Sequence, residues 1–234
     1  MNIIIPAAGE GRRFSEAGYT DPKPFIAVNG LPMVVRITRN VKPRKHPSRV
    51  FWLVRSEHLD LARGLAAPEG VECLEVKGLT QGAPCTVLLA IDHINNTQPL
   101  LIANSDQLID VPIDDFLEAM EGADGGMMVF WSDDPKWSFV RCSGNKVQEV
   151  AEKIPISHDA NVGIYYFARG AYFVEAVERM IARDIRTRGE FYVAPVFNEL
   201  ILDGLDVRAY PILSEQMHGL GTPADLQAYL ESQA

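Results

Sequence analysis

The chain has 234 residues, of which 47% are hydrophobic, so it is long enough to bury one sizeable core. Its formal net charge of −9 argues against nucleic acid as a partner, so any phosphate site must be a local basic pocket. No apolar run approaches the roughly 18 residues that span a bilayer, which argues against a membrane partner.

The cysteines bear on the cellular compartment. Cys73, Cys85 and Cys142 are widely spaced and show no metal-binding pattern, so we interpret them as buried or neutral thiols. An odd number of cysteines without a signal peptide favours a reducing cytoplasm. We therefore expect a cytoplasmic protein, and the sequence leaves its oligomeric state open between monomer and dimer.

The N-terminal stretch predicts a strand that runs into a small anion-binding turn. Residues 3–6 read Ile-Ile-Ile-Pro, which is typical of a buried strand. Glycines in the next residues tolerate left-handed φ values, and exposed N–H groups in such a turn bind anions. Arg12 and Arg13 add positive charge, and Lys23 adds another cation on a proline-flanked segment. We infer a nucleoside triphosphate site around the turn residues Ala7, Ala8, Gly9, Glu10 and Gly11.

The chain up to residue 131 alternates strands with helices. Pro32 stands at the first position of one predicted helix, and Ser56 caps the next. This alternation is typical of an α/β protein with a mixed, mainly parallel sheet and helices on both faces. In chain order we expect an extended piece at 25–28, a helix at 32–41, a strand at 50–54, a helix at 56–65, a strand at 71–76, a helix at 83–94, a strand at 100–103, a helix at 114–121 and a strand at 127–131.

The pattern changes after Trp131. We expect a single domain over residues 1–234, with 1–130 as a nucleotide-binding half and 131–234 as an acceptor half that carries a small β-hairpin lobe. The elements predicted for this second half are a hairpin with strands at 138–142 and 147–151, a strand at 161–167, helices at 171–183 and 193–203, a strand at 207–211, and a helix from the cap Thr222 to residue 230.

Asp106 stands shortly after the predicted strand at 100–103. In open α/β sheets, ligands bind beyond the carboxyl ends of the strands, where the glycine turn also lies. A carboxylate that faces bound phosphates suits Mg²⁺, which takes one or two carboxylates plus phosphate oxygens and water. Asp106 is therefore the candidate metal ligand, and the alternative is a helix cap or a turn residue.

Polar residues of the second half are candidates for binding an acceptor. Glu152 and Lys153 end a hairpin strand and form either a solvated surface pair or an ion pair that holds a sugar and its phosphate. Asn161 and Gly163 open the next strand, where the glycine either breaks pairing or lets a ligand approach the backbone.

Gln81-Gly82 lies in the loop after the third predicted strand. A glutamine carries both a donor and an acceptor, so it can read a base edge, and the alternative is a solvated loop residue. The five histidines show no ligand spacing. His158-Asp159 has no serine or cysteine nucleophile motif nearby, which argues against a hydrolytic triad.

These motifs, in this order, resemble the sugar-1-phosphate nucleotidyltransferases, or nucleotide-sugar pyrophosphorylases, of the glucose-1-phosphate thymidylyltransferase type. The resemblance covers nearly the whole chain and implies a Rossmann-like fold of GT-A type. It rests on residues 6–14, 22–24, 30–33, 81–82, 104–106, 136–140, 144–146, 152–153, 161–165, 189–193 and 219–223.

The resemblance implies an enzyme whose substrates are a nucleoside triphosphate and a sugar 1-phosphate. An oxygen of the sugar phosphate attacks the α-phosphorus in line, and pyrophosphate leaves. Positioning and neutralisation of charge then dominate the catalysis, with Mg²⁺ as the cofactor. The sugar phosphate is already ionised at neutral pH and needs no general base.

The resemblance also implies roles for individual residues. Arg13 holds the leaving pyrophosphate, Lys23 stabilises charge at the α-phosphate, and Asp106 binds Mg²⁺. On the acceptor side, Lys153 holds the attacking phosphate, and the sugar is bound by Glu152, Asn161 and Gly163. The nucleotide is bound by Ala7, Ala8, Gly9, Gly11, Arg12, Gln81 and Gly82.

Two departures limit what the resemblance implies. Many members carry a second metal aspartate near residues 217–220, where this chain reads Met-His-Gly-Leu, so His218 is either a substitute ligand or a structural residue. The chain also lacks the usual C-terminal helical extension, so the tetramer and allosteric site of the thymidylyltransferases are not implied.

Other readings remain open at the sequence level. A cytidylyltransferase for a non-sugar alcohol phosphate can share the N-terminal motif, but its His-Asp-Ala element should follow the fourth strand, and here it lies at 158–160. A non-catalytic nucleotide-binding module would have lost the polar acceptor residues. A glycosyltransferase would usually show Asp-x-Asp where this chain has Asn104-Ser105-Asp106.

Overall fold

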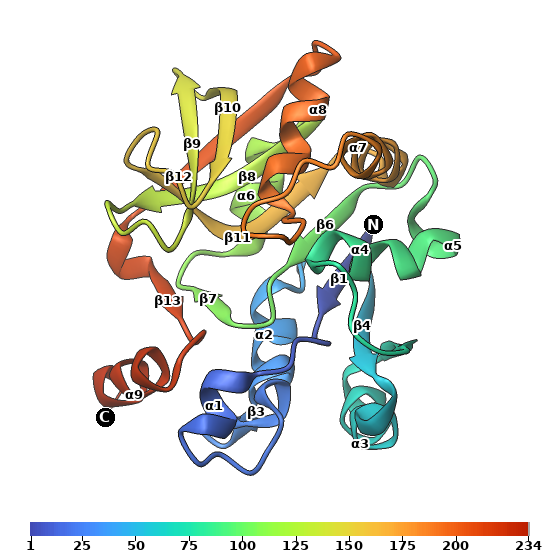
Figure 1. Cartoon of the computed structure of the whole chain (residues 1–234), viewed down its shortest axis with the longest axis vertical. Coiled ribbons are helices and arrows are strands. Elements are labelled where there is room, and N and C mark those ends of the chain that lie inside the picture. Colours follow the sequence, from blue (N-terminus) through green and yellow to red (C-terminus); the bar gives the residue numbers. More distant parts are fainter. Residues whose placement is uncertain (234) are drawn as a thin grey trace.

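The computed structural model describes residues 1–233, and its central feature is a nine-stranded mixed sheet (Figure 1). The β-branched and apolar runs predicted as strands form its buried middle. In spatial order the strands are β5 (Val71–Val76), β4 (Arg49–Arg55), β1 (Asn2–Pro6), β6 (Leu100–Ala103), β11 (Asp159–Phe167), β8 (Gly125–Trp131), β12 (Val207–Ile212), β10 (Lys146–Glu152) and β9 (Ser138–Ser143).

Strand direction changes in the middle of this sheet. The strands β5, β4, β1 and β6 pair in parallel, as expected for alternating strands and helices. The strand β11 then runs antiparallel to both β6 and β8, while β8 and β12 are parallel. The expected mixed sheet is confirmed, and its uninterrupted parallel part is confined to the first four strands in this order.

The sheet separates two hydrophobic cores, because alternate residues of a strand face opposite sides. On β1, Ile3 and Ile5 belong to one core and Ile4 belongs to the other. The first core is covered by α1 (Arg12–Glu16), α2 (Met33–Val41), α3 (Leu59–Ala66), α6 (Ile113–Ala119) and α9 (Pro223–Ser232). The second is covered by α4 (Ala83–Val87), α5 (Ile91–Ile94), α7 (Gly170–Ala182) and α8 (Phe197–Leu202). Helices on both faces are therefore confirmed.

Several helices differ from their predicted form. The helix expected at 83–94 is broken, because a 3₁₀ turn separates α4 from α5. Ser56 does not cap α3, because a 3₁₀ turn precedes that helix and the Ser56 hydroxyl donates to the Val76 carbonyl instead. Thr222 does cap α9, since its hydroxyl accepts from the Asp225 N–H. The 3₁₀ turns are η1 (Lys23–Phe25), η2 (Ser56–His58), η3 (Ala67–Glu69), η4 (Leu88–Ala90), η5 (Ala194–Val196) and η6 (Ser214–Gln216).

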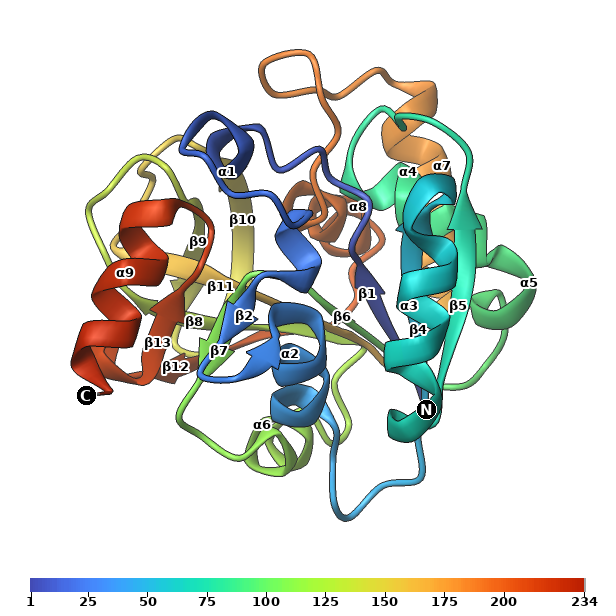
Figure 2. The same ribbon diagram turned by 90° about the horizontal axis from the view of Figure 1, so that it is seen from below.

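Two small sheets lie outside the main one, and of their strands only the one at 27–28 falls in a predicted element, the extended piece at 25–28. One pairs β2 (Ala27–Val28) with β3 (Leu31–Pro32). The other pairs β7 (Gln107–Ile109) with β13 (Met217–Gly219) and lies between α2 and α9 (Figure 2). The Leu220 N–H donates to the Asp106 carbonyl over 2.7 Å, so this sheet holds the C-terminal segment beside Asp106.

The state of the cysteines and the character of the helices can be given directly from the structure. Cys73, Cys85 and Cys142 are unbonded and half-buried, and burial raises the pKa of each thiol, to about 11 for Cys142. None of the helices within residues 1–233 has the length and apolar character needed to cross a membrane.

Candidate active site

Two adjoining cavities open at the carboxyl end of the parallel strands. The first has a volume of about 590 Å³ and contains the glycine turn that follows β1. The second has a volume of about 480 Å³ and lies between the end of β6 and the hairpin strand β10. They form one continuous cleft, because both are lined by Pro6, Arg13, Ala83, Ser105 and Gly221.

The predicted turn lines the first cavity with small residues and backbone. Its N–H groups at positions 8–11 donate to no backbone carbonyl within residues 1–233, so they are available to an anion. Gly11 is left-handed, with φ +64°, and a Cβ there would lie only 2.9 Å from the Lys23 Cβ. Glycine at this position therefore allows Lys23 to pack against the turn. The predicted residues that line this cavity are Ala7, Ala8, Gly9, Gly11, Arg12, Arg13, Lys23 and Gly82.

Lys23 and Asp106 meet at the junction of the two cavities. The Lys23 Nζ lies 2.6 Å from the Asp106 Oδ2, and both side chains are about four-fifths buried. The proline on each side of Lys23 limits its backbone, and the end of β6 fixes Asp106. The sequence places these residues 83 positions apart, and the fold joins them in one ion pair.

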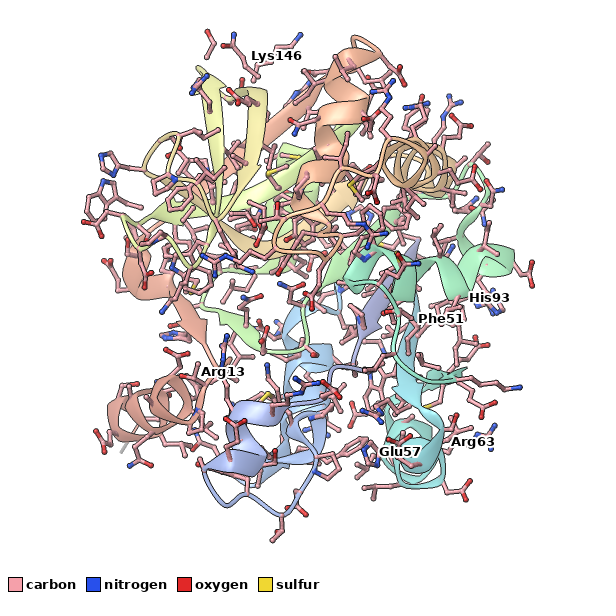
Figure 3. The ribbon with its side chains drawn as sticks, in the orientation of Figure 1. Arg13, Phe51, Glu57, Arg63, His93 and Lys146 are labelled. Atoms are coloured by element: carbon pink, nitrogen blue, oxygen red, sulfur yellow. The ribbon has the colours of Figure 1, made fainter. Side chains whose placement is uncertain are left out.

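The two arginines of the turn behave differently. The Arg12 Nε lies 2.6 Å from the Glu10 Oε2, and its side chain is 72% exposed. Arg13 forms no ion pair with any residue in the described part of the chain and lines both cavities. Figure 3 labels it on α1, beside β13 and α9. Arg13 is therefore the cation available to a ligand that extends across the junction.

Gln81 and Gly82 are both predicted to bind the nucleotide, but only Gly82 lines one of the two cavities. Gln81 is exposed and lines neither cavity, and its side-chain carbonyl accepts a hydrogen bond from the Arg186 guanidinium. Gly82 lines the first cavity and bridges to Phe191, which donates its N–H to the Gln81 carbonyl over 2.9 Å. The role of Gln81 in reading a base stays a prediction.

Glu152 and Lys153 both line the second cavity, although consecutive residues of a regular strand face opposite sides. The reason is the left-handed backbone of Lys153, with φ +59°, which turns the chain at the end of β10. Such a conformation costs a residue with a side chain about 1–3 kcal/mol. The two form a largely buried ion pair rather than a solvated surface pair, because the Lys153 Nζ lies 3.8 Å from the Glu152 Oε1 and the Glu152 side chain is 5% exposed.

Two amide side chains in the second cavity have unused hydrogen-bonding atoms. Asn161 is 3% exposed, and its Oδ1 accepts from the Gly163 N–H over 2.6 Å, which leaves its Nδ2 without a partner within residues 1–233. The Gln107 Oε1 is likewise buried without a partner. Gly163 has φ +91°, and a Cβ there would lie 2.1 Å from the Gln107 Oε1. Both residues line the second cavity, and a ligand hydroxyl that reached these two atoms would satisfy both, because a hydroxyl donates and accepts.

Burial raises the pKa of the Glu152 carboxyl, and the Ser138 hydroxyl and the Lys153 charge offset only part of this effect. The folded state therefore holds the Glu152 proton more tightly than the unfolded state does. As pH rises from the ordinary carboxyl value through the raised one, the folded state loses stability relative to the unfolded chain.

We expect Glu152→Gln to raise the melting temperature at pH 7, where it removes a buried charge, and to leave it nearly unchanged at pH 4. Thermal unfolding at the two pH values measures this, with Glu149→Gln on the same strand as the control. A variant that melts below the wild-type protein at pH 7 would contradict this account of Glu152.

The sequence analysis missed several residues of this cleft. Arg188 and Tyr192 reach the second cavity from the loop between α7 and η5, Gln107 comes from β7, and Asp225 comes from the first turn of α9. Tyr192 lies in the stretch 189–193 that carries the resemblance, but no role was assigned to it; the other local signals are the glycine after Arg188 and the spacing of Asp225 three residues after a helix cap. His218 lines neither cavity, because its Nε2 pairs with the Asp110 Oδ2 over 2.7 Å, so the structural alternative for this histidine is supported.

Two carboxylates, those of Asp106 and Asp225, lie close to Gly221 in the second cavity. A Cβ added to Gly221 would lie 3.3 Å from the Asp106 Oδ2 and 3.9 Å from the Asp225 Oδ2. Mg²⁺ takes one or two carboxylates and completes its shell with phosphate oxygens and water. Residues 1–233 contain no group of three His, Cys, Asp or Glu side chains arranged to hold a metal ion alone. The donor set therefore suits a cation that arrives with a phosphorylated ligand.

One protein-family model and several curated proteins match most of this chain. The model of the MobA-like NTP transferase domain matches residues 3–167. The bifunctional protein GlmU of Ralstonia nicotianae is 24% identical over 97% of this chain and 50% of its own length. The chain thus spans about half the length of the curated relatives it matches.

Solved structures share the fold. The nucleoside-diphosphate-sugar pyrophosphorylase of Vibrio cholerae RC9 is 28% identical and superimposes with a TM-score of 0.87, covering 98% of this chain and 99% of its own. The inositol-1-phosphate CTP transferase of T. maritima is 18% identical with a TM-score of 0.75, covering 99% of this chain and 95% of its own. The second likeness is one of fold alone.

Proposed function

Because the chain belongs to the MobA-like NTP transferase domain family, we propose that it transfers a nucleotidyl group from a nucleoside triphosphate to a sugar 1-phosphate and releases pyrophosphate. The observation that carries this proposal is the continuous cleft, in which one cavity ends in a glycine turn and the other in buried polar side chains. Arg13 lines both cavities, and the ion pair of Lys23, which lines the first, with Asp106, which lines the second, joins them.

The triphosphate lies in the first cavity, with its phosphates against the free N–H groups of the glycine turn. Lys23, at the junction, stabilises negative charge on the α-phosphate. Arg13 has no competing ion pair within residues 1–233 and holds the leaving pyrophosphate. Because Lys23 is held by Asp106 before the substrate binds, its charge stabilises the transition state with little reorganisation.

The acceptor lies in the second cavity, with its phosphate towards the junction. Lys153 and Arg188 both line this cavity and supply positive charge for that phosphate. The buried Glu152, Asn161 and Gln107 offer one carboxylate, one amide donor and one amide acceptor, a combination that suits hydroxyl groups. This chemistry supports a polyol phosphate such as a sugar 1-phosphate, whose phosphate attacks the α-phosphorus in line.

Asp106 and Asp225 would hold Mg²⁺ together with phosphate oxygens. Bound there, Mg²⁺ supplies further neutralisation of phosphate charge. Lys23 already partners Asp106, so the carboxylate also fixes the position of the ammonium group.

A second candidate is a cytidylyltransferase that uses a non-sugar alcohol phosphate. Inositol is a cyclic polyol, so inositol 1-phosphate could satisfy the same buried amides. The fold likeness to the inositol-1-phosphate CTP transferase of T. maritima is compatible with this candidate. The sugar phosphate is favoured by the likeness to the pyrophosphorylase of Vibrio cholerae, which is greater in both identity and TM-score.

We expect pyrophosphate release when the protein and Mg²⁺ are given the correct triphosphate and a sugar 1-phosphate. The test is a panel of ATP, CTP, GTP, UTP and dTTP against several sugar 1-phosphates, inositol 1-phosphate and choline phosphate. Turnover of inositol 1-phosphate alone would favour the second candidate. Turnover of choline phosphate alone, or of no acceptor, would contradict a polyol phosphate as the substrate.

A further inference from the structure

Tyr192 belongs to a segment that connects the two cavities. Its side chain lines the second cavity, and Glu190 lines the first. Between them, Phe191 is fully buried and donates its N–H to the Gln81 carbonyl, next to Gly82 of the first cavity. The backbone that carries Tyr192 is therefore anchored to the first cavity, while its side chain reaches the second.

The Tyr192 hydroxyl has two different neighbours. It donates its proton to the Glu190 Oε2 over 3.3 Å and accepts a hydrogen bond from the Lys153 ammonium. A phenol has one proton, so donation to Glu190 leaves the oxygen lone pairs directed to Lys153. The Lys153 Nζ also lies 4.2 Å from the centre of the Tyr192 ring, within the range of a cation–π interaction.

Lys153 needs such a partner, because it has a flexible four-carbon stem and a competing anion beside it. The buried Glu152 carboxylate lies 3.8 Å from the Lys153 Nζ, so the two form an ion pair that is longer than a direct hydrogen bond. An ammonium that moved onto Glu152 would neutralise that carboxylate and withdraw its own charge from the cavity. The bond to Tyr192 uses one of its three protons and leaves the others free for a ligand.

We propose that Tyr192 is a positioning residue, which holds the Lys153 ammonium off Glu152 and directs it at the phosphate of the acceptor. This inference rests on the proposed function for the identity of the acceptor. The contacts that carry it involve only the side chains of Glu152, Lys153, Glu190 and Tyr192.

The test is Tyr192→Phe, which removes the hydroxyl and keeps the ring. We expect kcat/KM for the acceptor to fall about tenfold, mainly through a higher KM, because binding in the ground and transition states is weakened alike. The KM for the triphosphate should change less than twofold, and the melting temperature should stay the same. Tyr172→Phe on α7, which removes a hydroxyl outside both cavities, is the matched control.

A double-mutant cycle separates positioning from a general structural role. In the Lys153→Ala background, Tyr192→Phe should have no further effect on the acceptor, because its partner is gone. Unchanged acceptor kinetics in the single variant would overturn the proposal. An equal loss with and without Lys153 would overturn it as well.

The same variants distinguish failure of this inference from failure of the proposed function. If the wild-type protein turns over no acceptor, the proposed function fails, and calorimetric titration with inorganic phosphate then decides the role of Tyr192. Weaker phosphate binding in Tyr192→Phe, together with equal binding by Lys153→Ala and the Lys153→Ala/Tyr192→Phe double variant, would support the positioning role. Equal binding by the wild-type protein and Tyr192→Phe would overturn it.

Discussion

Asp106→Asn should lower kcat by about a thousandfold while the protein stays folded, because in the proposed function one carboxylate serves two cations. Its Oδ2 fixes the Lys23 ammonium at 2.6 Å, and the carboxylate is our candidate ligand for Mg²⁺. Asparagine keeps the shape and removes the charge. A preorganised charged group at a transition state contributes about 10²–10³ in rate, and loss of the metal adds to this effect. Steady-state kinetics under saturating substrates measure the change.

Asp110→Asn is the control for this substitution. Asp110 lies four residues further along the chain and pairs with His218 outside both cavities. It should keep nearly full activity, and both variants should melt close to the wild-type protein. An Asp106→Asn variant that turns over at the wild-type rate would remove Asp106 from the metal role.

Lys153→Ala should reduce kcat/KM for the acceptor by about a hundredfold and leave the KM for the triphosphate within twofold or threefold. The reason is geometric, since Lys153 lines only the second cavity and the glycine turn lines only the first. Hydrogen bonds to charged groups contribute about 1.5–3 kcal/mol each, and about 2.7 kcal/mol corresponds to a hundredfold change in rate.

The matched control is Lys146→Ala, at the other end of the same strand β10 and labelled in Figure 3. Lys146 is exposed and lines neither cavity, so its loss should leave both KM values unchanged. If Lys153→Ala weakens only the use of the triphosphate, the two cavities have been assigned to the wrong substrates.

The residues that could be predicted from the sequence lie next to regular elements. The strand at Ile3–Ile5 is marked by three β-branched residues in a row, and the turn after it by its glycines. Asp106 could be placed because the end of a parallel strand is a common site for ligands. In each case, the local sequence determines both the element and the position of the functional residue relative to it.

The residues that could not be predicted depend on contacts between distant segments. Tyr192 matters because it reaches Lys153, 39 residues earlier, and nothing in the local sequence indicates that contact. Asp225 reaches the cleft because β13 pairs with β7, and such short strands leave no clear periodic pattern. The contact of the Gln81 side chain with Arg186, from the other half of the chain, likewise has no signal in the local sequence.

The central claim is that two phosphorylated substrates meet at the junction marked by Arg13, Lys23 and Asp106. There, the bond from the α-phosphorus to pyrophosphate is replaced by a bond from the α-phosphorus to the acceptor. The most direct test follows radioactive label from the triphosphate that supports turnover, placed either at the α-phosphorus or at the γ-phosphorus. The account predicts that the α label appears in the acceptor product and that the γ label appears in pyrophosphate. Transfer of the γ label to the acceptor, or its release as inorganic phosphate, would contradict it.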